Sequence, residues 1–224
     1  MASLLKPSKR NPTEVAPTPV AGRRRSEATR KLILQTTLEA LKTQSLQSIS
    51  IEGIARDAAV SKATIYRWWN SKGQIVIDAF IEMHLVKTPM RRDLPPAHAI
   101  ADHFVHLLEQ YSGWSGHLVA QILAEAQSNP DIGREFRERF HYGRRAVVRE
   151  VLSNWKSTGE LNQDTDLEVL MDLIYAPIYM RLMVGHAPLD MRFAEMHLTH
   201  LFKMLGLQAP PLEVFGVSAP FSKD

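Results

Sequence analysis

Apolar residues along this chain recur every three or four positions, which is the spacing of one face of an α-helix. In the segment 30–42, for example, they are Ile33, Leu34, Leu38 and Leu41. No stretch shows the apolar-polar alternation that a half-buried strand requires. The pattern therefore predicts an all-α protein. The other expected helices cover 51–58, 62–69, 71–86, 97–111, 117–126, 130–155, 166–184 and 191–205.

Residues that favour helix ends mark several of these boundaries. Two capping boxes are expected, Ser71 with Gln74 and Thr165 with Glu168. Asn129 is an expected N-cap followed by Pro130, and Gly159 is expected to end a helix. Pro177 lies inside an expected helix, and we expect a kink there because proline cannot donate the helical hydrogen bond.

The segment 50–72, SIEGIARDAAVSKATIYRWWNSK, predicts two short helices joined by a tight turn. Ser50 precedes the first helix and Ser61 the second, and serine is a favoured N-cap. Residues 59–61 leave a three-residue connection, which is the length of a helix-turn-helix turn. The apolar stripe of the second helix consists of Ile65, Trp68 and Trp69.

The outer face of the second helix carries small or donor-bearing residues suited to DNA. We expect phosphate contacts from Lys62, Thr64, Tyr66 and Lys72, and base-edge contacts from Ala63, Arg67 and Trp68. Inward packing is the alternative for Trp68. The expected DNA-binding set also includes the two caps, Ser50 and Ser61. The alternative for the whole segment is an αα-hairpin that only packs.

Charge is distributed unevenly along the chain. Residues 1–90 hold 14 Lys and Arg against 7 Asp and Glu, whereas residues 91–224 hold 13 against 17. The first 25 residues are rich in proline and poor in apolar periodicity, which predicts a disordered basic arm. Arg23, Arg24 and Arg25 end this arm, and we expect them to contact phosphates or the minor groove. A solvated tail is the alternative. The basic N-terminal region favours DNA binding over the packing hairpin.

Composition narrows the class of protein. The 224 residues are 45% hydrophobic, enough for a substantial core. Cysteine is absent, which excludes disulfides, thiolate metal sites and a cysteine nucleophile. No apolar run approaches the roughly 18 residues of a membrane span. We expect a cytoplasmic protein that is not an enzyme and needs no cofactor.

SKATIYRWWNSK (61–72) resembles the recognition helix and the following helix start of the tetracycline-repressor (TetR) family of bacterial transcription regulators. The spacing of Tyr66, Trp69 and Lys72 is its most specific part. The segment GELNQDTDLEVLMDLIYAPIYMRLMVGHAPLD (159–190) is similar to the C-terminal domain of one TetR subfamily. The chain departs from the family at Ala59 and Ala63, where glycine is common, and at Asn70, a frequent proline. If the turn is unchanged, Ala59 must adopt a strained backbone, at a cost of about 1 kcal/mol.

We expect four parts: a basic arm (1–25), which the composition indicates and the resemblance does not cover, a three-helix DNA-binding domain (26–72), a helical effector and dimerisation domain (73–207) and a tail (208–224). The resemblance implies a homodimer joined through the last two helices, which are apolar on most sides. A monomer that buries these faces internally is the alternative. A dimer would place two recognition helices about 34–36 Å apart on a palindromic operator. The resemblance to the TetR family also implies that a small-molecule effector releases the DNA, so that the protein acts as a repressor.

Polar and aromatic residues of the middle helices are the candidates for effector contact. They are Tyr111, Trp114, His117, Gln121, Glu125, Tyr175 and Tyr179.

Two other functions stay open. His98, Asp102 and His106 are spaced four apart on one helix face, and two of them could share a metal ion, as in a metal-binding protein or an enzyme. Three helical turns span too far for all three to meet one ion. The second alternative is a non-specific architectural DNA binder without an effector.

Overall fold

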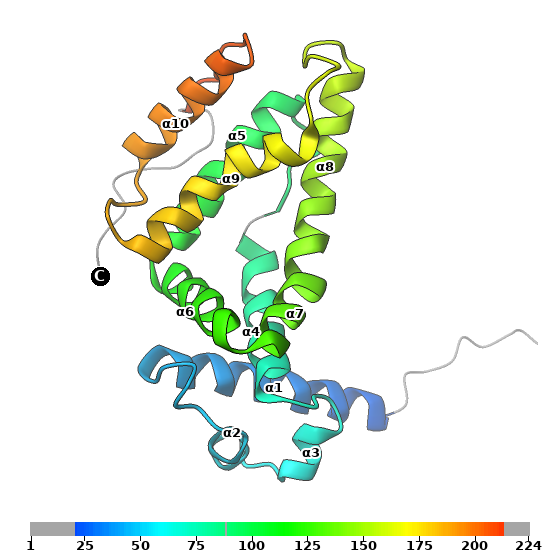
Figure 1. Cartoon of the computed structure of the whole chain (residues 1–224). Coiled ribbons are helices and arrows are strands. Elements are labelled where there is room, and N and C mark those ends of the chain that lie inside the picture. The colour runs from blue at the N-terminus through cyan, green and yellow to red at the C-terminus, as the bar shows by residue number, and fades with distance from the viewer. Residues whose placement is uncertain (1–20, 88, 213–224) are drawn as a thin grey trace, which may run out of the picture.

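The computed structural model describes residues 21–87 and 89–212, and every regular element in these ranges is a helix (Figure 1). The all-α prediction is confirmed. Three helices form the lower unit, which are α1 (Ala21–Thr43), α2 (Ile51–Asp57) and α3 (Lys62–Tyr66). The upper unit contains α4 (Lys72–Lys87), α5 (Pro96–Tyr111), α6 (Trp114–Ser128), α7 (Pro130–Phe136), the π-helical segment η1 (Arg137–His141), α8 (Tyr142–Ser157), α9 (Leu167–Val184) and α10 (Met191–Met204).

The two predicted serine caps set the geometry of the lower unit. The Ser50 hydroxyl accepts from the backbone N–H of Gly53, and the Ser61 hydroxyl accepts from that of Thr64, each at 3.1 Å. Between them Ala59 takes a φ of +52°, the left-handed conformation that the turn was expected to impose. These contacts orient α3 across the turn from α2, as a helix-turn-helix pair.

The start of α1 differs from the prediction. The helix begins at Ala21, so residues 21–25 continue it instead of belonging to a disordered arm. Residues 1–20 and the side chains of Arg23, Arg24 and Arg25 lie outside the described part of the structure. Their predicted DNA contacts therefore stay predictions.

The two predicted capping boxes of the upper unit differ from the structure. The N-cap of α9 is Asp166, whose carboxylate accepts from the N–H groups of Glu168 and Val169, so the predicted Thr165 capping box is wrong. In the other predicted capping box, the Ser71 hydroxyl accepts from the backbone N–H of Gln74 as expected. The Gln74 side chain, however, accepts from the backbone N–H of Asn70 instead of that of Ser71.

The single helix predicted for 130–155 is divided into α7, η1 and α8. Asn129 does cap α7, with Pro130 in its first turn, and Gly159 follows α8 with a φ of +80°. The π-helical segment η1 between α7 and α8 was not predicted, because the periodicity of apolar residues does not distinguish a helix with one inserted residue from a regular helix.

Helix α5 lies in the middle of the upper unit and is covered by α6, α8, α9 and α10 (Figure 1). The apolar face of α9 is only partly used by this packing. Val169, Leu173, Met180, Met183 and Val184 remain exposed on it, and α10 adds Met196 and Met204. No helix in the described ranges is both long enough and apolar enough to cross a membrane.

Candidate DNA-binding and effector sites

Helix α3 presents a donor-bearing face to solvent. Lys62, Ala63, Tyr66 and Arg67 are exposed along it, as expected for a helix that approaches DNA. Thr64 is half-buried, and its hydroxyl lies 3.0 Å from that of Ser61. The short helix thus gathers a lysine, an arginine and a tyrosine on one accessible surface.

The two tryptophans after α3 have different environments. Trp69 is 1% exposed, whereas Trp68 is 39% exposed. The prediction that both belong to one apolar stripe with Ile65 is wrong for Trp68, because α3 ends at Tyr66 and helical periodicity no longer sets the side on which Trp68 lies. Trp68 is therefore available at the surface beside Arg67, where the base-edge prediction placed it.

Both predicted phosphate-binding lysines have protein partners. The Lys62 ammonium lies 3.1 Å from the Glu52 carboxylate, and both side chains are exposed. A backbone hydrogen bond, aided by Lys62, lowers the pKa of Glu52. Lys72 donates to the carbonyl oxygens of Leu46 and Gln47 at 2.9 and 3.1 Å, which fastens the loop between α1 and α2 to α4. A phosphate contact by Lys72 stays a prediction and would compete with these two carbonyls.

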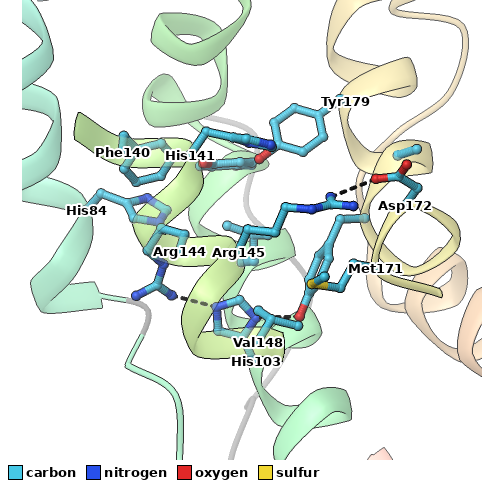
Figure 2. Close-up of a pocket in the computed structure, with 14 residues that line it drawn as sticks. His84, His103, Phe140, His141, Arg144, Arg145, Val148, Met171, Asp172 and Tyr179 are labelled. Atoms are coloured by element: carbon cyan, nitrogen blue, oxygen red, sulfur yellow. Dashed lines mark hydrogen bonds and ion pairs between the residues drawn. The ribbon is translucent and has the colours of Figure 1, made fainter. Parts of the chain in front are cut away.

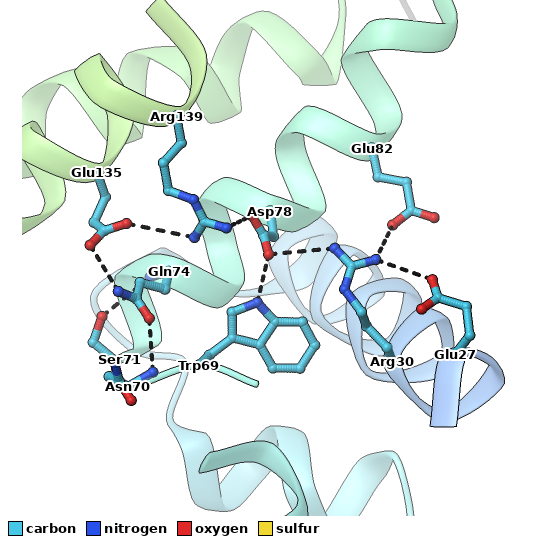
Figure 3. A network of polar contacts seen from close by, with 10 residues as sticks. All are labelled: Glu27, Arg30, Trp69, Asn70, Ser71, Gln74, Asp78, Glu82, Glu135 and Arg139. Carbon is cyan, nitrogen blue, oxygen red and sulfur yellow. Dashed lines mark hydrogen bonds and ion pairs between the residues drawn. The ribbon is translucent and has the colours of Figure 1, made fainter. Parts of the chain in front are cut away.

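The Asp78 carboxylate joins the lower unit to α4 and η1 (Figure 3). Its Oδ2 accepts from the indole N–H of Trp69 at 2.7 Å and lies 3.5 Å from Arg30 of α1. Its Oδ1 pairs with Arg139 of η1. Arg30 also lies over the Trp69 ring, 5.9 Å from its centroid. One largely buried carboxylate therefore fixes the end of α3 against two other elements.

A cavity of about 150 Å³ lies among α4, α5, η1, α8 and α9 (Figure 2). Its lining contains aromatic, apolar and cationic side chains. The lining residues are His84, His103, Leu107, Tyr111, Phe140, His141, Arg144, Arg145, Val148, Met171, Asp172, Tyr175, Ala176 and Tyr179.

A chain of polar contacts runs along the cavity wall. Arg144 lies 2.6 Å from His103 Nε2, and His103 Nδ1 lies 2.9 Å from the Tyr175 hydroxyl (Figure 2). Arginine can only donate, so Nε2 accepts and the proton of the neutral ring lies on Nδ1, which donates to Tyr175. Burial, together with Arg144, lowers the pKa of His103 to about 3 and keeps the ring neutral. Burial also lowers the pKa of His84 to about 3.

The second arginine of the cavity is held by carboxylates. Arg145 lies 2.7 Å from both Glu168 and Asp172 of α9. Glu168 also pairs with Arg149, and the arginines lower its pKa. This cluster ties α8 to the first turns of α9 at the rim of the cavity.

The structure separates the seven predicted effector contacts into two groups. Tyr111, Tyr175 and Tyr179 line the cavity. The other four lie outside it. They are Trp114, His117, Gln121 and Glu125.

Three of those four connect α6 to the lower unit. The side-chain amide oxygen of Gln121 accepts from the backbone N–H of Leu46 at 2.8 Å, and the Glu125 carboxylate accepts from the Gln47 side chain at 3.1 Å. The Trp114 indole N–H donates to the carbonyl of Leu41 at 3.4 Å. These residues therefore fasten the end of α1 and its following loop to α6.

Sequence reasoning missed the charged and imidazole groups of the cavity. His84, His103, Arg144 and Arg145 come from three helices that are distant in sequence. No local pattern distinguishes them from ordinary helix-surface residues, and only the packing of the helices brings them together.

His106 and Asp102 of the histidine pattern on α5 are engaged in contacts within the helix. His106 Nδ1 donates to the carbonyl of Asp102 at 2.9 Å, and its distance to that carboxylate is 3.5 Å. Within the described ranges, no three His, Cys, Asp or Glu residues are placed to share an ion. The metal-binding alternative therefore gains no support from this part of the chain.

Comparison with known proteins gives matches to both units. The family described as "Bacterial regulatory proteins, tetR family" matches residues 33–79, and "Tetracyclin repressor-like, C-terminal domain" matches residues 96–201. The HTH-type transcriptional regulator YdeS of Bacillus subtilis is 30% identical over 84% of this chain and 94% of its own.

Solved structures share the fold at lower identity. The TetR family transcription regulator SCO0332 has a TM-score of 0.68 and 23% identity, covering 81% of this chain and 99% of that one. The regulator FadR of Bacillus subtilis, solved in complex with stearoyl-CoA, has a TM-score of 0.62 and 18% identity, covering 76% and 96%. At these identities the two structures support the fold alone.

Proposed function

Because the chain belongs to the TetR family of bacterial transcriptional regulators, we propose that it is a homodimeric repressor, released from a palindromic operator by a small molecule bound in the cavity. The observation that carries this proposal is the exposed donor-bearing face of α3, on a helix-turn-helix pair that is fastened to the cavity-bearing helices. We place the end of the DNA-binding domain at Lys72, where α4 begins.

The exposed residues of α3 supply both kinds of DNA contact. Lys62 and Tyr66 can donate to phosphates, and Arg67 is long enough to reach base edges. The Lys62–Glu52 pair is an exposed ion pair of small net value, so its exchange for a phosphate costs little. The architectural alternative needs no such ordered face and would rely on the basic residues of the segment 1–25.

The exposed apolar stripe on α9 supports dimerisation. Val169, Leu173, Met180 and Val184 recur at helical spacing on one side of the helix, and a monomer would leave them in water. A second copy is the partner that TetR-type symmetry offers, because a two-fold interface pairs the same surface of both subunits. It would also place two α3 helices at the spacing of successive major grooves, about 34–36 Å.

A single charged substitution tests the dimer. Leu173→Glu places a carboxylate in the centre of the stripe, and we expect sedimentation of the variant to show monomers at concentrations where the parent is dimeric. Leu32 is an apolar residue of similar exposure on α1, away from the stripe, so Leu32→Glu is the matched control. A dimeric Leu173→Glu variant would contradict this interface.

Two elements connect the cavity to the DNA-binding unit. Helix α4 carries His84 in the cavity wall and Asp78 against Trp69, about 9 Å apart along the helix axis. Segment η1 carries Phe140 in the wall and Arg139 on Asp78. A ligand that displaces His84 would move Asp78, the partner of Trp69, and one that displaces Phe140 would move Arg139, which pairs with Asp78. The two sites are then coupled through shared elements.

Selection of DNA from a random library by the purified full-length chain, at physiological salt, tests the proposed function. Enrichment of one palindrome is the expected result. Uniform, salt-sensitive binding without a motif would favour the architectural alternative, and absence of binding would refute the regulator.

A further inference from the structure

The size and walls of the cavity limit the effector to a compact, largely apolar molecule. Its volume is about 150 Å³, and a cavity of about 150 Å³ holds a single benzene ring. Phe140 and His84 meet edge to face in the wall, with ring centroids 4.8 Å apart. Tyr111 and Tyr179 add a second edge-to-face pair at 6.4 Å. Such walls offer ring edges and faces to a planar aromatic ligand.

The charges in the same wall favour an anion. The lining contains two guanidinium groups, those of Arg144 and Arg145, and one carboxylate, that of Asp172. With both histidines of low pKa neutral, these lining residues together carry one more positive than negative charge. Burial lowers the pKa of Arg144, which means that the surroundings penalise its charge. An anionic ligand beside the guanidinium would offset that penalty.

A tyrosine hydroxyl completes the set of donors. Tyr175 accepts from His103, so its own hydroxyl hydrogen is left to donate elsewhere. Tyr111 is 1% exposed, and burial together with the neighbouring hydroxyl of Tyr179 raises its pKa, so its hydroxyl already has a polar neighbour. Tyr175 is therefore the hydroxyl that can donate to a ligand oxygen in the cavity.

We infer that the effector is a small aromatic carboxylate, with its ring against Phe140 and its carboxylate directed to Arg144 and the hydroxyl of Tyr175. This inference rests on the proposed function, since it names the ligand class of the same cavity. It excludes neutral aromatics and long acyl chains as preferred ligands, on grounds of charge and volume respectively.

Calorimetric titration of the full-length protein without DNA tests the class with four probes. We expect benzoate to bind and to raise the melting temperature. Benzamide has the same shape without the charge and should bind at least roughly tenfold more weakly, since bonds to charged groups are the stronger ones. Benzamidine, a cation, and dodecanoate, a long-chain anion, should not compete. Equal binding of benzoate and benzamide, or preferred binding of dodecanoate, would overturn the inference.

Variants assign the binding to particular groups. Arg144→Gln should weaken benzoate binding roughly tenfold or more, and Tyr175→Phe, which keeps the ring and its packing, by a smaller factor. Arg134→Gln on α7 is the matched control, because that arginine is exposed and outside the cavity. If Arg144→Gln fails to fold, the benzoate affinity of Tyr175→Phe still tests the assignment. Unchanged benzoate affinity in Tyr175→Phe would overturn the assignment.

The DNA selection keeps the two proposals separate. An enriched palindrome with no benzoate binding would refute the ligand class and leave the regulator standing. Benzoate binding that depends on Arg144, in a protein that selects no DNA, would support the ligand class and refute the proposed function.

Discussion

Replacement of Asp78 removes the carboxylate that holds Trp69 against α1 and η1. The side chain is only 10% exposed, and it accepts from the Trp69 indole while pairing with Arg139 and, at longer range, with Arg30. Asp78→Asn keeps the shape and one acceptor but loses both ion pairs, so we expect a loss of about 2–3 kcal/mol in the free energy of unfolding. Asp78→Ala also leaves the buried indole N–H unsatisfied, which adds about 1–3 kcal/mol.

Urea unfolding monitored by circular dichroism, at one fixed protomer concentration, measures these losses. Asp131→Asn is the control, because Asp131 makes a similar pair with Arg134 at 74% side-chain exposure and should cost less than about 0.5 kcal/mol.

A double-mutant cycle isolates the bond between the indole and the carboxylate. In a Trp69→Phe background, Asp78→Ala should cost about 1–2 kcal/mol less than in the parent, since the indole N–H is already absent. Additive effects of the two substitutions, or an Asp78→Asn variant as stable as Asp131→Asn, would refute the structural role of this network. We also expect Asp78→Asn to weaken operator binding, because α3 loses its fixed position.

Two further predictions concern DNA affinity and acid stability. Lys62→Ala should reduce the slope of log DNA affinity against log salt concentration by about 0.9, as expected for one lost phosphate contact. Glu52→Gln should strengthen DNA binding, because it frees Lys62 from its ion pair. An unchanged slope for Lys62→Ala in filter-binding titrations would contradict the phosphate contact. His84 and His103 have folded pKa values of about 3, so the stability linked to their neutral rings is complete above the unfolded value of about 6.5 and is lost as pH falls from there towards 3. Each should remove about 2 kcal/mol between pH 6.5 and 5 in urea titrations, and His84→Gln should halve this loss; a pH-independent parent would argue against both buried neutral rings.

Local patterns in the sequence predicted most of the helices and the helix-turn-helix pair. Ser50 and Ser61 cap α2 and α3 because a serine hydroxyl can reach the free N–H groups of the next turn without help from distant residues. Ala59 adopts the left-handed conformation because the three-residue turn demands it. The exposed cations Lys62 and Arg67 follow from helical periodicity alone, since position on a helix fixes which side a residue faces.

The tertiary structure alone decided which polar residues meet. Gln121 and Glu125 were expected in the effector site, yet they hold the loop after α1, because the orientation of α6 is set by packing against other helices. Asp78 gave no signal in the sequence, although it joins three elements. Arg144, His103 and Tyr175 lie on three different helices, and their contact depends on how α5, α8 and α9 cross. Helix formation depends on neighbours within one or two turns, whereas a cavity depends on the relative placement of whole helices, which no local spacing specifies.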